Sequence, residues 1–200
     1  MPWDHIVWEG QHLHDLDWSD DTLTACTFTR CTFTGGSFEG SVFKNCVFDS
    51  CSFRFVTLAG ASAQGCAFLN CTFDEANLFN ASFRDCKCTG SGFAGAYAAA
   101  FTIAGGSYAY CCMTRLSFHN AQLSGVNLSH ADLRDCSFRE ADLRHSDLSY
   151  ALMQGCDLEK ADLRGANLSG VDIRGLKMKD TSIDLEQAVV IAQGLGAILH

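Results

Sequence analysis

The sequence predicts an all-β fold, a four-sided parallel β-helix in which the chain turns a corner every five residues. Three observations predict it. A large apolar residue recurs at positions whose numbers end in 3 or 8, from Trp8 to Ile183, over 36 consecutive blocks without an insertion. The position two residues earlier is small, as at Cys26 and Ala161. A period of five fits neither a strand, which repeats every two residues, nor a helix, which repeats about every 3.6.

Four blocks of five residues close one square coil of 20 residues, so we expect about nine coils. The large residue fills the axis of the coil and the small residue fits near a corner. The next coil stacks about 4.8 Å away and pairs with it as in a parallel sheet. Asp, Asn, Ser and Thr before the large residue can bond the corner backbone. Because one coil cannot bury its own faces, stability comes from stacked neighbours.

The apolar columns differ along the chain. The first half is rich in Phe, as at Phe28, Phe48 and Phe68, and the second half is rich in Leu. Parallel stacks of Phe rings pack well. The columns thin out over residues 86–106, where we expect an irregular or bent coil with Phe101 filling the space that Ala98 leaves.

The period of five stops after Ile183, and the last segment has a different pattern. Asp184 can cap a helix in which Leu185, Val189, Ala192 and Gln193 recur at helical spacing. Gly194 and Gly196 should end this helix, and residues 197–199 are typical of a short strand. We therefore divide the chain into a lead-in and first partial coil (1–12), the β-helix (13–183) and a C-terminal module (184–200).

Two interpretations of the C-terminal module stay open. It can be an intramolecular lid on the last coil, whose strand edges would otherwise be exposed. It can also bury its apolar residues in a symmetric dimer, the interpretation that we favour. The predicted dimer interface consists of Leu185, Val189, Val190, Ala192, Leu195 and Ile198.

Composition restricts the classes of function. The net charge of -9 disfavours direct nucleic-acid binding. No apolar run is long enough for a membrane span, and the first residues lack a signal-peptide pattern. We therefore expect a cytoplasmic protein with reduced cysteines.

The residues show no pattern typical of catalysis or cofactor binding. Ten of the 12 cysteines occupy the small position. They could form a metal site or a redox ladder, but small, easily buried residues in tight corners explain them better. The seven histidines share no ligand spacing, and no phosphate loop, nucleophile elbow or paired-carboxylate site occurs. We expect no enzyme activity, cofactor or metal.

The blocks in "ADLRGANLSG" (161–170) resemble the A-(D/N)-L-x-x motif of pentapeptide-repeat proteins. This resemblance implies a right-handed quadrilateral β-helix. The segment "VDIRGLKMKDTSIDLEQAVVIAQGLGAILH" (171–200) is similar to the C-terminus of the Qnr-type quinolone-resistance proteins. That similarity implies a tail-to-tail dimer that binds DNA gyrase or topoisomerase IV and protects it from fluoroquinolones, microcin B17 or albicidin. The uninterrupted frame resembles the loop-less branch, which includes the mycobacterial MfpA type and toxin-immunity members.

The acidic columns of the second half suggest a recognition surface. The candidates are Asp132, Asp142, Asp162, Asp172, Glu140 and Asp180. One interpretation is a solvated exterior of mixed charge. The other is a partial imitation of the charge of a DNA duplex. The alternative to topoisomerase protection is a pentapeptide-repeat scaffold with an unrelated partner, since one fold serves many roles.

Overall fold

The structure is a computed structural model that describes residues 2–198. It divides into two compact units, Met1–Ser107 and Tyr108–His200, which we describe separately. In the described part of the chain no helix has the length and apolar character needed to cross a bilayer.

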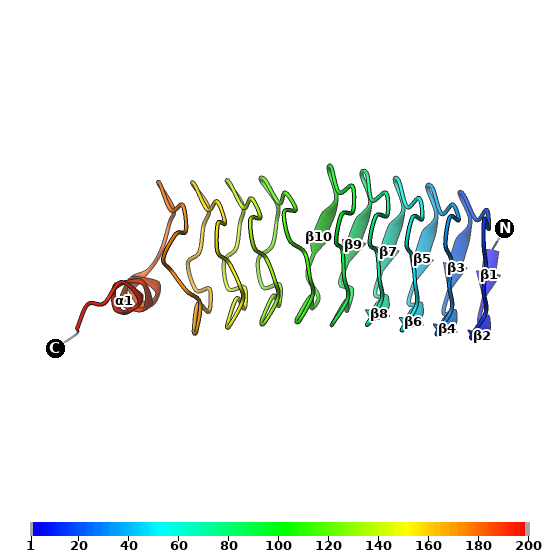
Figure 1. Ribbon diagram of the computed structural model, residues 1–200, viewed down its shortest axis with the longest axis horizontal. Coiled ribbons are helices and arrows are strands. Elements are labelled where there is room, and N and C mark those ends of the chain that lie inside the picture. The colour runs from blue at the N-terminus through cyan, green and yellow to red at the C-terminus, as the bar shows by residue number, and fades with distance from the viewer. Residues whose placement is uncertain (1, 199–200) are drawn as a thin grey trace. The chain divides into compact units, whose positions relative to one another are not determined.

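The first unit consists of short strands that pair in parallel with strands 20 residues away. One sheet has the order β1-β3-β5-β7-β9-β10 and the other the order β2-β4-β6-β8. Figure 1 shows these strands repeated side by side in successive coils. Their bounds are β1 Pro2–Asp4, β2 Val7–Glu9, β3 Thr22–Thr24, β4 Thr27–Thr29, β5 Val42–Lys44, β6 Val47–Asp49, β7 Ser62–Gln64, β8 Ala67–Leu69, β9 Ser82–Arg84 and β10 Thr102–Ala104.

Each coil of the first unit has four faces. The two sheets form the first and second faces. Parallel bridges between residues 20 apart form the third face through His12, Thr32, Ser52, Thr72 and Gly92, and the fourth through Asp17, Ser37, Thr57, Asn77 and Tyr97. Most residues at the corners between faces are left-handed, as at Asn45 (φ 52°) and Gly65 (φ 62°). The predicted class, a right-handed quadrilateral β-helix with a short C-terminal helix, is confirmed.

The second unit keeps the spacing of 20 residues without regular strands. Single parallel bridges join residues such as Gln122, Asp142, Asp162 and Ser182. Within residues 108–198 no strand occurs, so the part of the β-helix that is built from strands has about five turns. The expected count of nine coils is therefore wrong as a count of turns of regular structure. In the second unit only one residue of each five-residue block bridges to its neighbour, which is too little to form a strand.

The core lies on the axis of each unit, as the repeat predicts. Rings stack from coil to coil with centroids 4.9 Å apart for Phe28 and Phe48 and 5.0 Å for Phe48 and Phe68. Phe101 is buried as expected, and its ring lies 5.2 Å from that of Phe83 in an edge-to-face contact. The expected bend over residues 86–106 stays a prediction.

Buried thiols at the corners, such as Cys136 and Cys156, donate to the backbone. The Sγ atom of Cys136 lies 3.0 Å from the carbonyl oxygen of Met113, 23 residues earlier. The hydroxyl of Ser91 donates in the same way to Phe68 (2.8 Å). Burial raises the pKa of Cys136 to about 12, so this thiol stays protonated and remains a donor. These contacts support the structural interpretation of the cysteines.

Candidate functional site

The C-terminal segment forms helix α1 (Leu185–Gly194) with the predicted N-cap. One carboxylate oxygen of Asp184 accepts from the amide nitrogens of Glu186 (3.0 Å) and Gln187 (3.4 Å). The side-chain oxygen of Gln187 accepts in return from the Asp184 amide nitrogen (3.0 Å). This reciprocal capping box satisfies helix donors that otherwise have no partner. Asp184 takes part in the capping box through both its side chain and its backbone amide, and the helix therefore begins where the repeat stops.

The same two side chains attach the helix to the last coil. In the coil below, the amide of His145 donates to the carbonyl of Arg164, 19 residues later. At Gly165 the acceptor is instead the Asp184 side chain (2.7 Å). Gln187 is 2 % exposed, and its side-chain nitrogen donates to the carbonyl of Ala166 (2.9 Å). Asp184 and Gln187 therefore provide side-chain replacements for the backbone partners that a further coil would supply.

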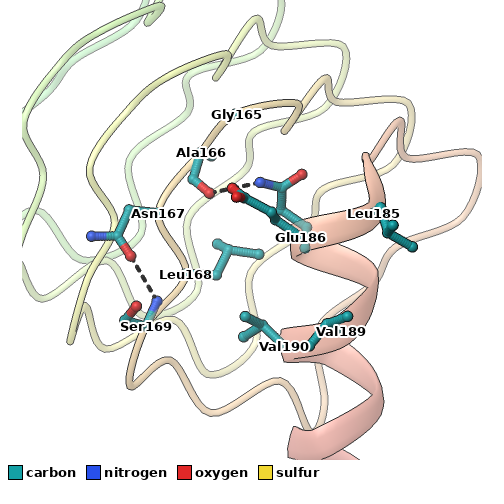
Figure 2. Close-up of a pocket in the computed structure, with 10 residues that line it drawn as sticks. Gly165, Ala166, Asn167, Leu168, Ser169, Leu185, Glu186, Val189 and Val190 are labelled. Carbon is teal, nitrogen blue, oxygen red and sulfur yellow. Dashed lines mark hydrogen bonds between the residues drawn. The ribbon is translucent and has the colours of Figure 1, made fainter. Parts of the chain in front are cut away.

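A groove of about 550 Å³ separates helix α1 from the last coil. Figure 2 shows Leu168 of the coil and Val190 of the helix facing each other across it. The coil side is held by an Asn167 side-chain oxygen, which accepts from the amide of Ser169 (3.1 Å). The lining is Gly165, Ala166, Asn167, Leu168, Ser169, Leu185, Glu186, Gln187, Val189 and Val190.

The residues predicted for a dimer interface lie on this helix and beyond it. Leu185 and Ile198 are each 80 % exposed and Leu195 is 66 % exposed. Val189, Val190 and Ala192 are half-buried. The module thus leaves an apolar surface that the chain itself does not cover, but the structure contains one chain and the dimer stays a prediction.

The strand expected at residues 197–199 is wrong for residues 197 and 198, which belong to no helix or strand. Position 199 lies outside the described residues. A strand needs a neighbouring strand for its backbone groups, but the Ala197 amide instead donates to the carbonyl of Ala192 at the end of the helix (2.9 Å).

Four of the six predicted acidic residues are ion-paired with an arginine two positions later. Asp142 contacts Arg144 at 2.7 Å and Asp162 contacts Arg164 at 2.6 Å. The same spacing pairs Asp132 with Arg134 (2.6 Å) and Asp172 with Arg174 (2.9 Å). Residues two apart on an extended chain point to the same side, which brings the two charges together.

The pairing changes the electrostatics of these columns. The hydrogen bond from the Arg144 guanidinium lowers the pKa of Asp142 below its usual value, and Arg164 does the same for Asp162. Arg144 also lies 3.9 Å from Asp162 in the next coil. Each carboxylate is therefore ionised but locally neutralised, which favours an exterior of mixed charge over a continuous acidic stripe.

The six acidic residues do not share one face. Asp142 and Asp162 bridge to each other. Asp132 lies ten residues before Asp142, which is half a coil and therefore two faces away. Glu140 is at a corner, 3.4 Å from the Lys160 ammonium. Asp180 is also at a left-handed corner. Their combined role in recognition stays a prediction.

Two exterior features were not among the predicted site residues. The first unit carries 11 Asp and Glu against 5 Lys and Arg, a net -6, whereas the second unit carries 12 against 9, a net -3. The negative charge is thus concentrated outside the predicted surface. Large exposed aromatic residues also occur on the first unit, at Phe55, Phe79 and Tyr97. In the sequence, each of them stands out as an aromatic residue at a position whose number does not end in 3 or 8.

Among the residues that the structure describes, no cluster of three or more His, Cys, Asp or Glu could hold a metal ion.

The fold resembles those of several solved proteins. QnrB1, a plasmid-mediated fluoroquinolone resistance protein, matches with a TM-score of 0.85 at 20% identity over 100% of both chains. Its full-length form matches with a TM-score of 0.84 at 20% identity, over 98% of this chain and 100% of that one. HetL, a pentapeptide repeat protein involved in heterocyst differentiation regulation from the cyanobacterium Nostoc sp., matches with a TM-score of 0.57 at 19% identity, over 90% and 87% of the two chains. No curated protein matches the sequence.

Family models match most of the repeat region. The pentapeptide repeat region model covers residues 111–187. The model of eight pentapeptide repeats covers residues 23–62 and 51–90. Together with the four-sided coils, these matches show that the chain is a pentapeptide repeat protein.

Proposed function

We propose that this protein is a non-enzymatic binding protein that protects DNA gyrase, and topoisomerase IV where it is present, from topoisomerase poisons. The observation that carries the proposal is the similarity to QnrB1, which extends over the whole of both chains, the C-terminal helix included. A protein that binds by shape and charge needs no catalytic group. The poison would be a quinolone or a peptide-type toxin such as albicidin or microcin B17.

The charge distribution supports a partial imitation of DNA. A net charge of -9 repels nucleic acid, and it attracts a partner surface that itself binds DNA phosphates. The paired carboxylates of the second unit weaken the contribution of that region. We therefore assign the larger electrostatic attraction to the first unit, with its net -6.

The test is gyrase supercoiling in the presence of ciprofloxacin or albicidin. Increasing amounts of the protein should restore supercoiling, and the protein should form a complex with the gyrase holoenzyme. If no poison is relieved at any protein concentration and no complex forms, the proposal is wrong.

The second candidate is a scaffold with an unrelated partner. The similarity to HetL, whose described role is in regulation of differentiation, favours it. A scaffold should leave poisoned gyrase unchanged, so the same assay separates the two candidates.

We also propose that the active form is a homodimer formed through helix α1 and the residues that follow it. Exposed Leu185, Leu195 and Ile198 support this, because a second copy would remove their apolar surface from water. Val189→Asp should give monomers in sedimentation. Leu185→Asp should do the same without disturbing the folded monomer, since Leu185 is 80 % exposed. An unchanged mass for both variants, with Gln193→Asp as the exposed control, would refute the dimer.

A further inference from the structure

The fourth face of the first unit carries an exposed pair of stacked aromatic rings. Phe79 is 47 % and Tyr97 is 59 % exposed. Their ring centroids are 6.1 Å apart and their planes differ by 11°. Neither residue belongs to the core positions of the repeat. Isolated exposed apolar residues are common, whereas exposed apolar residues that lie together favour a binding surface.

Small apolar residues flank Tyr97 in the sequence. Tyr97 lies in the segment "AGAYAAA" (94–100), in which Ala99 and Ala100 are exposed. Earlier coils have polar or acidic residues in the same columns, Asp17 and Ser37 below Tyr97 and Glu39 below Phe79. The face therefore changes from acidic to apolar along the unit. We call Phe79, Tyr97, Ala99 and Ala100 the aromatic patch.

Hydrogen bonds fix the main chain that carries both rings. The Tyr97 amide donates to the carbonyl of Ala76 (2.9 Å), and its carbonyl accepts from Leu78 (2.8 Å). The Phe79 amide donates to the side-chain oxygen of Asn77 (3.0 Å). A main chain that is already fixed loses little further conformational entropy when a partner binds. Rigid aromatic side chains are also enriched among residues that dominate binding energy.

The chemistry of the patch defines its partner. Aromatic faces attract Arg and Lys through their quadrupole, and the carboxylates of Asp74 and Glu75 belong to the coil of Phe79. The unit as a whole carries a net -6. An enzyme that binds DNA needs Lys and Arg on its DNA-binding surface, so its surface complements both properties.

We propose that the aromatic patch is the surface with which this protein docks on its topoisomerase, against an arginine- and lysine-bearing surface of the enzyme. The inference rests on the proposed function and specifies which face of the chain makes the contact. The acidic columns of the second unit then contribute less than Phe79 and Tyr97.

The test uses residues that the fold already accepts in the same columns. Phe79→Ala copies Ala59 and Ala99, and Tyr97→Asn copies Asn77. The double variant should keep the thermal unfolding midpoint of the parent, because both side chains are about half exposed. Its dissociation constant for immobilised gyrase holoenzyme should rise at least ten-fold, with a matching loss of protection from ciprofloxacin.

The control removes two equally exposed tyrosines from the second unit, which stack on the His130 ring (4.7 and 5.1 Å between centroids) and lack the alanine-rich segment that follows Tyr97. Tyr110 and Tyr150 are 61 % and 58 % exposed. Each occupies a left-handed corner, and Asn70 has that conformation in the same column of the first unit. Tyr110→Asn with Tyr150→Asn should leave gyrase affinity within two-fold of the parent.

The outcomes separate the two proposals. If the parent protein binds gyrase and the Phe79→Ala, Tyr97→Asn variant binds equally well, the docking surface is elsewhere and only this inference is wrong. An equal loss in the tyrosine control overturns it too. If the double variant sediments with a lower mass than the parent protein, the patch binds a second copy of this chain and not the enzyme. No binding by the parent overturns the proposed function together with this inference.

Discussion

Replacement of Gln187 tests how the C-terminal helix is attached to the β-helix. Gln187→Ala removes two hydrogen bonds, one to the Ala166 carbonyl (2.9 Å) and one from the Asp184 amide (3.0 Å). Each such bond contributes about 0.5–1.5 kcal/mol, and a buried carbonyl left without its donor adds to the cost. The side chain is 2 % exposed, so water does not replace these contacts in the folded state. The attachment of helix α1 should weaken by about 2 kcal/mol.

Hydrogen exchange measures this attachment separately from global stability. A loss of about 2 kcal/mol should speed exchange of the α1 amides roughly thirty-fold, since about 1.4 kcal/mol is a factor of ten. The thermal midpoint of the β-helix should change little, because the coils keep their own ladders. Gln187→Glu keeps the acceptor for Asp184 and loses the donor to Ala166, so it should also speed exchange.

The control is Gln193→Ala, on the same helix and exposed to solvent. Its α1 amides should exchange at the parent rate or more slowly, since alanine favours helix. If Gln187→Ala behaves like Gln193→Ala, the side-chain replacement of the missing coil does not hold the helix. If the first-unit amides exchange no more slowly than in the parent in either variant, that conclusion is unchanged.

Three further predictions concern the repeat itself. Gly106→Ala should lower the thermal stability of the protein several-fold more than Gly60→Ala. Both glycines are left-handed, but a Cβ atom at Gly106 meets the backbone of the coil below, whereas one at Gly60 meets nothing within 4 Å. Both thermal midpoints check this, and equal losses would contradict it. In the native state a thiol reagent should react first with Cys112, the half-buried cysteine, and with the others only after denaturation. Rapid reaction of several thiols would be inconsistent with the buried corners. Arg144 lowers the pKa of Asp142 in the folded state, so the pair stabilises above the usual Asp value and this stability is lost as pH falls below about 4. Asp142→Asn should flatten that acid loss in thermal unfolding, and an identical pH profile would refute the pair's contribution.

The periodicity alone predicts most of the fold. Three positions of each block of five can be polar only if the other two are buried, so the large residue is expected to point inward. Phe48 and Leu148 are both fully buried. The cap at Asp184 follows equally from local chemistry. The count of nine coils was wrong as a count of turns built from strands, because periodicity does not say how many residues of a block will pair.

The candidate site was less predictable because it depends on contacts between side chains. The sequence shows the column of aspartates and the column of arginines separately. That they pair follows only from a spacing of two residues, as between Asp142 and Arg144. The attachment by Gln187 requires knowing that the Ala166 carbonyl lacks a further coil. A sequence pattern shows the exposed Tyr97 only as a departure from the frame.

These departures bear on how such a fold acquires a function. The core uses two positions of each five, so the other three can change without disturbing the axis. A regular exterior, such as the aspartate and arginine pairs, repeats along the chain and cannot by itself distinguish one site from its neighbours. Phe79 and Tyr97 break that regularity on a single face. Recognition of one partner in one orientation requires such a break, so departures from the repeat are the places where mutagenesis of this protein should begin.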